Sequence, residues 1–147
     1  HVKDYVSIQS IRFSGRFSLT LDIPAALYSE KVLKLILQPL VENSFYHGLD
    51  YCTAGDNITI WAERSGPVLY ITVSDNGKGM NADTLESIRR KLSEEASFTE
   101  LGHRNKQGIG LKNIHSRIEL YYGKGYGLNI RSAPGEGTSI TIKIPAL

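Results

Sequence analysis

Two pairs of strand-like segments, each joined by a short turn, constrain the fold of this chain more than any other feature. The first pair is NITIWAE (57–63) and VLYITVSD (68–75), and the second is GLNIRSA (127–133) and GTSITIKI (137–144). Within each segment apolar and polar residues alternate, and glycine and proline mark the turns, as in β-hairpins. FSLTLDI (17–23) alternates in the same way. The sequence therefore predicts two hairpins and one further strand.

Three other segments have apolar residues spaced three and four apart, which predicts amphipathic helices. They are residues 33–47, about 81–92 and 108–122. Pro39 must start or kink the first of these helices, because its ring blocks an interior hydrogen bond. Asn81 and Asp83 are N-cap candidates of the second, and Gly123 is the C-cap candidate of the third.

The remaining segments set the expected domain boundaries. Residues 1–14 show helical periodicity with no capping residue ahead of them, so we expect the end of a linker helix that continues upstream. Residues 15–147 then form one catalytic or binding domain. The polar, aperiodic stretch 93–107 is expected to be a mobile lid.

Composition excludes several classes of protein. The 147 residues are 41% hydrophobic and 22% charged, as in an ordinary globular domain. Because the net charge is only +2 and the basic residues are scattered among acidic ones, no nucleic-acid stripe or polybasic membrane patch is expected. Cys52 is the single cysteine, so an internal disulfide is excluded.

Three polar clusters interrupt the apolar pattern, and the first lies in the helix predicted over 33–47. In VENSFYHG (41–48), Asn43 and His47 are four residues apart and share one helix face. An amide oxygen is a hard ligand that suits Mg²⁺, which takes few protein ligands beside water and phosphate oxygens. Asn43 is therefore the candidate metal ligand, with a solvated polar face as the alternative.

The second and third clusters suit the two ends of a nucleotide. In DNGKGM (75–80), Asp75 ends a buried strand and can accept a hydrogen bond from an exocyclic amine, while the glycines let the backbone approach a flat ring. A tight turn with an aspartate cap is the alternative. GIGL (108–111) opens a helix, where free amides and the helix dipole bind phosphate oxygens. Glycine as an ordinary helix entry residue is the alternative.

The order of these motifs resembles the GHKL superfamily, which groups gyrase, MutL and related ATPases with histidine kinases. LQPLVENSFYHG, DNGKGM, GIGLKNI and GEGTSITIKIP are similar to its N box, two glycine boxes and terminal GT motif. QPLVEN, SIQSIRF and IELYYG further resemble sensor histidine kinases of the LytS and YesM type. The resemblance covers nearly the whole chain. It implies a two-layer α/β (α+β) sandwich of the Bergerat type, with helices on one face of a mixed, mostly antiparallel sheet.

The same resemblance implies ATP and Mg²⁺ as cofactors and assigns site residues. Asn43 would coordinate Mg²⁺ between the phosphates, and Asp75 would bind the adenine amine with support from Thr138. The other implied cofactor-binding residues are His47, Gly48, Gly77, Gly79, Met80, Gly108, Ile109, Gly110 and Leu111. Residues 93–107 would be the lid over the nucleotide.

Two positions depart from the family pattern. Hydrolysing members carry a water-activating glutamate four residues before the asparagine, where this chain has Pro39, so Glu42 is the candidate catalytic base. Three residues after the asparagine, kinases commonly carry a phosphate-contacting lysine, where this chain has Tyr46. The candidates to replace that charge are His47, His103, Arg104, Lys106 and Lys112.

The resemblance thus implies the ATP-binding catalytic domain of a two-component protein-histidine kinase. It would position Mg·ATP for phosphoryl transfer to a histidine in a dimerisation domain that this chain lacks. His103 and His115 are expected on the lid and helix surfaces. The parent would be a membrane-anchored homodimer that phosphorylates a response regulator, with this domain in the cytoplasm. The alternatives are a hydrolysing ATPase of the gyrase or MutL kind, an anti-sigma serine kinase, and a docking module whose nucleotide site has decayed.

Overall fold

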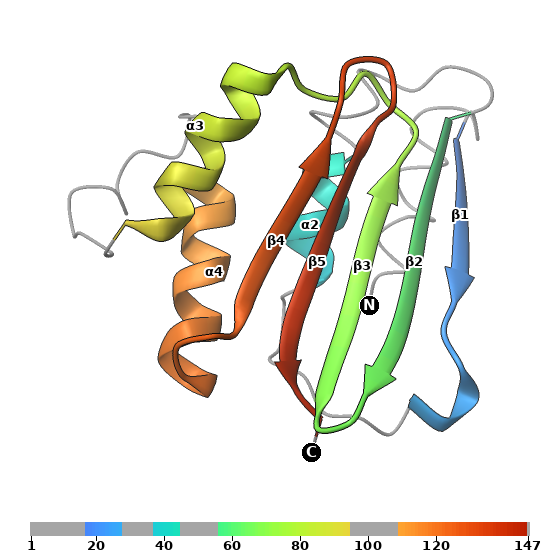
Figure 1. The fold of residues 1–147 in the computed structure, drawn as a ribbon. Helices are drawn as coiled ribbons and strands as arrows, with labels where there is room; N and C mark the ends of the chain where they lie inside the picture. The colour runs from blue at the N-terminus through green and yellow to red at the C-terminus, as the bar shows by residue number, and fades with distance from the viewer. Residues whose placement is uncertain (1–16, 28–36, 45–55, 95–108, 147) are drawn as a thin grey trace.

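The computed structural model describes residues 17–27, 37–44, 56–94 and 109–146. Its strands are β1 (Phe17–Asp22), β2 (Asp56–Ser65), β3 (Val68–Asp75), β4 (Gly127–Ser132) and β5 (Thr138–Pro145). They form one sheet in the order β1-β2-β3-β5-β4 (Figure 1). The pairs β2–β3 and β4–β5 are the two predicted hairpins, and β3 pairs antiparallel with β5. The strand predicted over 17–23 is also confirmed, and it pairs in parallel with β2.

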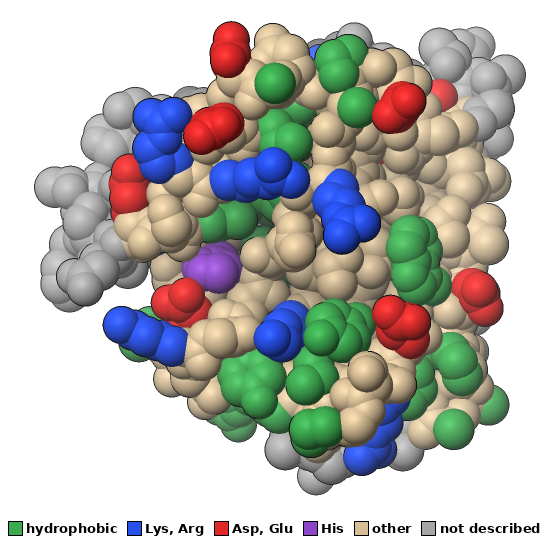
Figure 2. Space-filling model, viewed as in Figure 1, with side chains coloured by type: hydrophobic (Ala, Val, Ile, Leu, Met, Phe, Trp, Pro, Cys, Tyr) green, Lys and Arg blue, Asp and Glu red, His purple; other side chains and the backbone are tan. Residues whose placement is uncertain are grey.

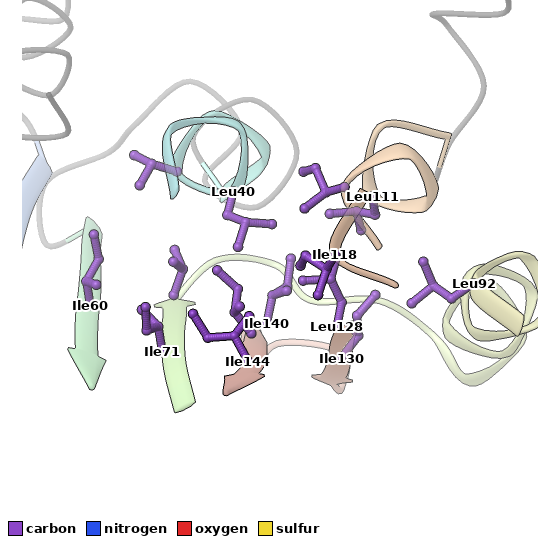
Figure 3. Packing of buried hydrophobic residues seen from close by; sticks show 14 of the residues in the cluster. Leu40, Ile60, Ile71, Leu92, Leu111, Ile118, Leu128, Ile130, Ile140 and Ile144 are labelled. Atoms are coloured by element: carbon purple, nitrogen blue, oxygen red, sulfur yellow. The ribbon is translucent and has the colours of Figure 1, made fainter. Parts of the chain in front are cut away.

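The helices are α2 (Leu37–Asn43), α3 (Ala82–Ser93) and α4 (Ile109–Tyr122), with a short 3₁₀ turn, η1 (Ala25–Leu27). Helices α2 and α4 lie on one face of the sheet, and α3 packs beside α4 and β4 (Figures 1 and 3). The predicted class, a two-layer α/β sandwich with a mostly antiparallel sheet, is confirmed. Within the described ranges, none of the helices has the length and hydropathy needed to cross a membrane.

Helix ends follow the capping chemistry that the sequence predicts. Asn81 is the N-cap of α3, where its side-chain oxygen accepts a hydrogen bond from the Thr84 N–H at 2.8 Å. Gly123 has φ +107° and donates its N–H to the Glu119 carbonyl at 2.8 Å, which closes α4. One boundary was wrong, because Ser93 is the last residue of α3 and not the first residue of a lid. The expected linker helix 1–14 and lid residues 95–107 lie outside the described residues.

The core lies between the sheet and the helices. Alternate residues of β5, Ile140, Ile142 and Ile144, are each at most 1% exposed, as the period-2 pattern predicts. They pack with Leu40 of α2 and Ile118 of α4, both fully buried (Figure 3). The intervening strand residues face away from the helices, and several are serines and threonines whose hydroxyls pair across strands. Such pairs are Thr72 with Thr141 at 2.9 Å and Ser74 with Ser139 at 2.8 Å.

Candidate functional site

Asp75 is a buried carboxylate at the carboxyl end of β3, and its two oxygens differ in their hydrogen bonding. The residue is 5% exposed. Its Oδ1 accepts hydrogen bonds from the Gly77 N–H at 3.0 Å and the Thr138 N–H at 3.3 Å. Its Oδ2 is buried and has no hydrogen-bond partner among the described residues. Since buried polar atoms are rarely left unpaired, Oδ2 is a free acceptor suited to a donor on a ligand.

The protonation of Asp75 reflects its burial. Desolvation raises the pKa of the carboxyl above its ordinary value of 3.8, because the charged form loses water. Interactions with the Gly77 N–H, the Ser44 side chain and the Thr138 N–H oppose this rise, whereas the negative charge of Asp56 adds to it. A donor placed at Oδ2 would stabilise the ionised form, so ligand binding and ionisation of Asp75 are coupled.

Two glycines allow the loop after β3 to pack against the β4–β5 turn. Gly79 has φ +69°, and a Cβ at this position would collide with the Ala133 carbonyl oxygen. Gly137 has φ +78°, and a Cβ there would collide with the carbonyl oxygen of Asp75. The Gly135 N–H also donates to the Lys78 carbonyl at 2.7 Å. The backbone approach itself therefore requires glycine at Gly79, independently of any ligand.

Ser132 connects the two loops, and the sequence analysis did not predict it. Its Oγ accepts a hydrogen bond from the Met80 N–H at 2.8 Å and donates to the Gly137 carbonyl at 2.9 Å. Because its single hydrogen is used there, the 2.9 Å contact with Thr138 Oγ1 requires the threonine hydroxyl to donate. Ser132 pairs with Thr138 in the β4–β5 register. A hairpin register worked out from the turn 133–137 would have placed this hydroxyl beside Thr138.

The predicted metal and base residues lie at the end of α2. Asn43 is the last residue of the helix and is half-buried. The half-buried Glu42 accepts a hydrogen bond from Gln38 Nε2 at 3.3 Å. Pro39 lies within this helical segment. Among the described residues, no group of three or more His, Cys, Asp or Glu side chains could hold a metal. An Mg²⁺ bound mainly by phosphates and water would need only one or two ligands from the protein.

The predicted phosphate-binding residues begin α4. Ile109 and Gly110 are its first residues, and a Cβ on Gly110 would meet no described atom within 4 Å. Leu111 is 4% exposed and belongs to the core, so its backbone N–H is the group available at the helix end. The remaining predicted site residues, His47, Gly48 and Gly108, lie outside the described residues.

His115 is not exposed on α4 as expected, because it is half-buried between α4 and β4. Its side chain is 14% exposed and lies against Gly127, where a Cβ would collide with the imidazole ring. Its Nδ1 accepts the Leu128 N–H at 2.9 Å, so Nε2 carries the proton that contacts Glu119 Oε1 at 2.8 Å. The expectation was wrong because the missing side chain of Gly127 admits the ring between α4 and β4. Both ring nitrogens are engaged, which disfavours His115 as a phosphoryl acceptor.

An open groove between α3, α4 and β4 lies apart from these predicted residues. His115 lines it together with Arg89, Glu119 and Lys124. Figure 2 shows basic, acidic and histidine side chains gathered on one face of the molecule. Arg89 donates from Nη2 to the Ile130 carbonyl at 2.7 Å, which ties α3 to the edge of β4. None of the described residues that line the groove is a predicted nucleotide-binding residue.

Comparisons with known proteins agree with the motif order. Residues 28–147 match the family described as histidine kinase-, DNA gyrase B-, and HSP90-like ATPase. The sensor histidine kinase YesM of Bacillus subtilis is 39% identical over 144 residues, which are 98% of this chain and 22% of that protein. The sensor protein kinase HptS of Staphylococcus aureus is 32% identical over 99% of this chain and 26% of its own length. The chain thus spans about a quarter of these relatives.

Solved structures share the fold at low sequence identity. The catalytic domain of histidine kinase ThkA has a TM-score of 0.71 and 17% identity, covering 99% of this chain and 89% of that one. The mycobacterial sensor histidine kinase MprB has a TM-score of 0.62 and 15% identity, covering 99% and 91%. These likenesses show the arrangement of strands and helices.

Proposed function

The chain belongs to the family of histidine kinase-, DNA gyrase B- and HSP90-like ATPases, and we propose that it is the ATP-binding catalytic domain of a two-component sensor histidine kinase. The curated relatives YesM and HptS are both named as sensor kinases, which supports this branch of the family. The chain corresponds to about a quarter of the length of those proteins.

The free Oδ2 of Asp75 is the observation that carries the nucleotide site. A buried acceptor without a donor is costly, and a ligand that supplies an N–H removes the cost. The exocyclic amine of adenine is such a donor. In this proposal Gly77, Gly79 and Met80 form the wall of the base pocket, and Thr138 holds Asp75 through its backbone N–H.

The start of α4 and the end of α2 would hold the phosphates. Gly108, Ile109, Gly110 and Leu111 would offer backbone N–H groups at the positive end of the helix dipole. His47 and Gly48 would complete this side of the site. Asn43 would hold Mg²⁺ through its amide oxygen. Magnesium usually takes few ligands from the protein, so one asparagine at this helix end fits it. When bound, the metal neutralises phosphate charge.

The arrangement would present the γ-phosphate to an incoming imidazole nitrogen of the parent protein. The nitrogen–phosphorus bond forms as the bond to the β,γ-bridging oxygen breaks, and ADP leaves. Glu42 is the proposed base that accepts the imidazole proton. Asp75 would orient the adenine ring, and the α4 amides would orient the phosphates. Most of the catalysis would therefore come from alignment. Pro39 offers no water-activating side chain, which favours transfer over hydrolysis.

The proposed setting is a cytoplasmic domain of a membrane-anchored, homodimeric parent. ATP would bind here, the acceptor histidine would lie in the dimerisation domain, and a response regulator would then receive the phosphoryl group. The kinase names of the curated relatives support this setting.

Calorimetric titration with a non-hydrolysable ATP analogue, with and without Mg²⁺, tests the proposal. We expect a dissociation constant tighter than about 1 mM, worth roughly 4 kcal/mol, and tighter binding with Mg²⁺ than without it. Asn43→Ala should remove the Mg²⁺ dependence. If the chain bound neither the analogue nor adenosine, the nucleotide site would be refuted and a docking role favoured.

A second measurement separates transfer from hydrolysis. Incubated alone with γ-labelled ATP, the chain should neither label itself nor turn over ATP steadily. Steady hydrolysis that disappears in Glu42→Gln would instead identify a hydrolysing ATPase.

A further inference from the structure

The hydroxyl of Ser132 uses its whole hydrogen-bonding capacity within the fold. Its Oγ accepts the Met80 N–H at 2.8 Å, donates to the Gly137 carbonyl at 2.9 Å and lies 2.9 Å from Thr138 Oγ1. A hydroxyl has one hydrogen and two lone pairs, so these three contacts use all of them. The contact with Thr138 therefore joins a lone pair of Ser132 to the hydrogen of the threonine hydroxyl.

This direction decides what the Thr138 hydroxyl can offer to a ligand. Its hydrogen is directed to Ser132, its partner in the β4–β5 pair, so the Thr138 oxygen can only accept further hydrogen bonds. Thr138 is 7% exposed, and a buried hydroxyl that lost this partner would turn toward another acceptor. Ser132 thus keeps Thr138 in the acceptor orientation.

Thr138 lies beside the free acceptor of the site. It is directly opposite Asp75 in the β3–β5 pair, and its N–H donates to Asp75 Oδ1 at 3.3 Å. Side chains of opposite residues project from the same face of a sheet, with Cβ atoms about 4.5–5.5 Å apart. Asp75 Oδ2 is itself an acceptor without a partner among the described residues. Two acceptor oxygens therefore lie close together, while the hydrogen of Thr138 is directed toward β4.

We propose that Ser132 is a positioning residue that sets the choice of purine base at this site. Two acceptors match the exocyclic amino group of adenine, which carries two hydrogens, and they repel the C6 oxygen of a 6-oxopurine such as hypoxanthine. By holding the hydrogen of Thr138, Ser132 prevents this hydroxyl from donating to such an oxygen. The inference rests on the proposed function and deepens it, because it assigns the discrimination between amino and oxo purines to a residue that acts through Thr138.

Calorimetric titrations of the whole chain with ADP and IDP test this assignment. The two nucleotides share ribose and phosphates, but IDP carries an oxo group at C6 and a hydrogen on N1. The unmodified chain should bind ADP more tightly. In Ser132→Ala the Thr138 hydroxyl can turn and donate to the oxo group, so the preference for ADP over IDP should fall about fivefold, the usual contribution of one neutral hydrogen bond. Ser132→Thr, which keeps a hydroxyl, should retain the preference.

Ser139→Ala is the matched control, because Ser139 adjoins Thr138 on β5 and its hydroxyl contacts Ser74 at 2.8 Å on the other face of the sheet. It should leave the preference for ADP unchanged. A second comparison uses a chain that carries Thr138→Val. Adding Ser132→Ala to this chain should not change the preference further, because the hydroxyl through which Ser132 acts has been removed.

A merely structural role of Ser132 predicts a different result, in which Ser132→Ala weakens ADP and IDP equally, and that result would overturn the assignment. Equal affinities of the unmodified chain for ADP and IDP would do the same, as would an equal fall in Ser139→Ala or a fall that persists beside Thr138→Val. If Ser132→Ala does not fold, Ser132→Cys replaces it, because a thiol is a weak acceptor, and an unchanged preference there overturns the assignment. If the unmodified chain binds neither nucleotide, the nucleotide site itself is refuted.

Discussion

Replacing Asp75 with asparagine should abolish adenine recognition while preserving the shape of the side chain. Oδ1 faces two backbone N–H donors, from Gly77 and Thr138. The asparagine amide must therefore place its oxygen there and its NH₂ group at the position of Oδ2. That NH₂ would oppose the amine of adenine, donor against donor, and it would have no acceptor among the described residues.

The expected loss follows from the charge of the lost acceptor. A hydrogen bond to a charged group contributes about 1.5–3 kcal/mol, which corresponds to roughly 10- to 150-fold in affinity. Asp75→Asn should weaken an ATP analogue by this factor in a calorimetric titration. A GTP analogue should be weakened less, because its O6 accepts from the new NH₂ group. The ratio of the two affinities is therefore a sharper measure than either affinity alone.

Asp83→Asn is the matched control, because Asp83 is exposed in the first turn of α3. It should leave both affinities unchanged. If Asp75→Asn bound the ATP analogue within twofold of the unmodified chain, Asp75 would not be the adenine contact. Equal losses for the ATP and GTP analogues would point to a general disturbance of the loop and would also refute the donor–acceptor reasoning.

Three further predictions concern stability, measured by urea unfolding. The pKa of Asp75 is raised in the folded state, so its contribution to stability is fully present below the unfolded pKa and is lost as pH rises through the folded pKa. Asp75→Asn should remove this fall of the unfolding free energy with pH. Gly79→Ala should cost more than Gly135→Ala, because both have positive φ (about 1 kcal/mol each) but only Gly79 collides with backbone; equal costs would contradict this. Ser132→Ala should cost about 1–3 kcal/mol, because the Met80 N–H loses its acceptor, and an effect below 0.5 kcal/mol would show that water replaces the hydroxyl.

Local pattern predicted most of the fold. The period-2 segments became β2, β3, β4 and β5, because alternation fixes which side chains face the core. Asn81 and Gly123 closed α3 and α4 as expected, because capping depends on neighbouring backbone groups alone. The site was predicted less completely, since Ser132 acts through hydrogen bonds to residues up to 52 positions away.

The sequence by itself determined the secondary structure, the motif order and the identity of the buried acid, because these depend on residue type and short-range spacing. Tertiary structure alone decided that Asp75 keeps one oxygen without a partner among the described residues, and that the ring of His115 fits over Gly127. Each of these results from the approach of elements distant in the chain. Hydrogen-bond partners and desolvation are set by that approach, and neither can be read from spacing along the sequence.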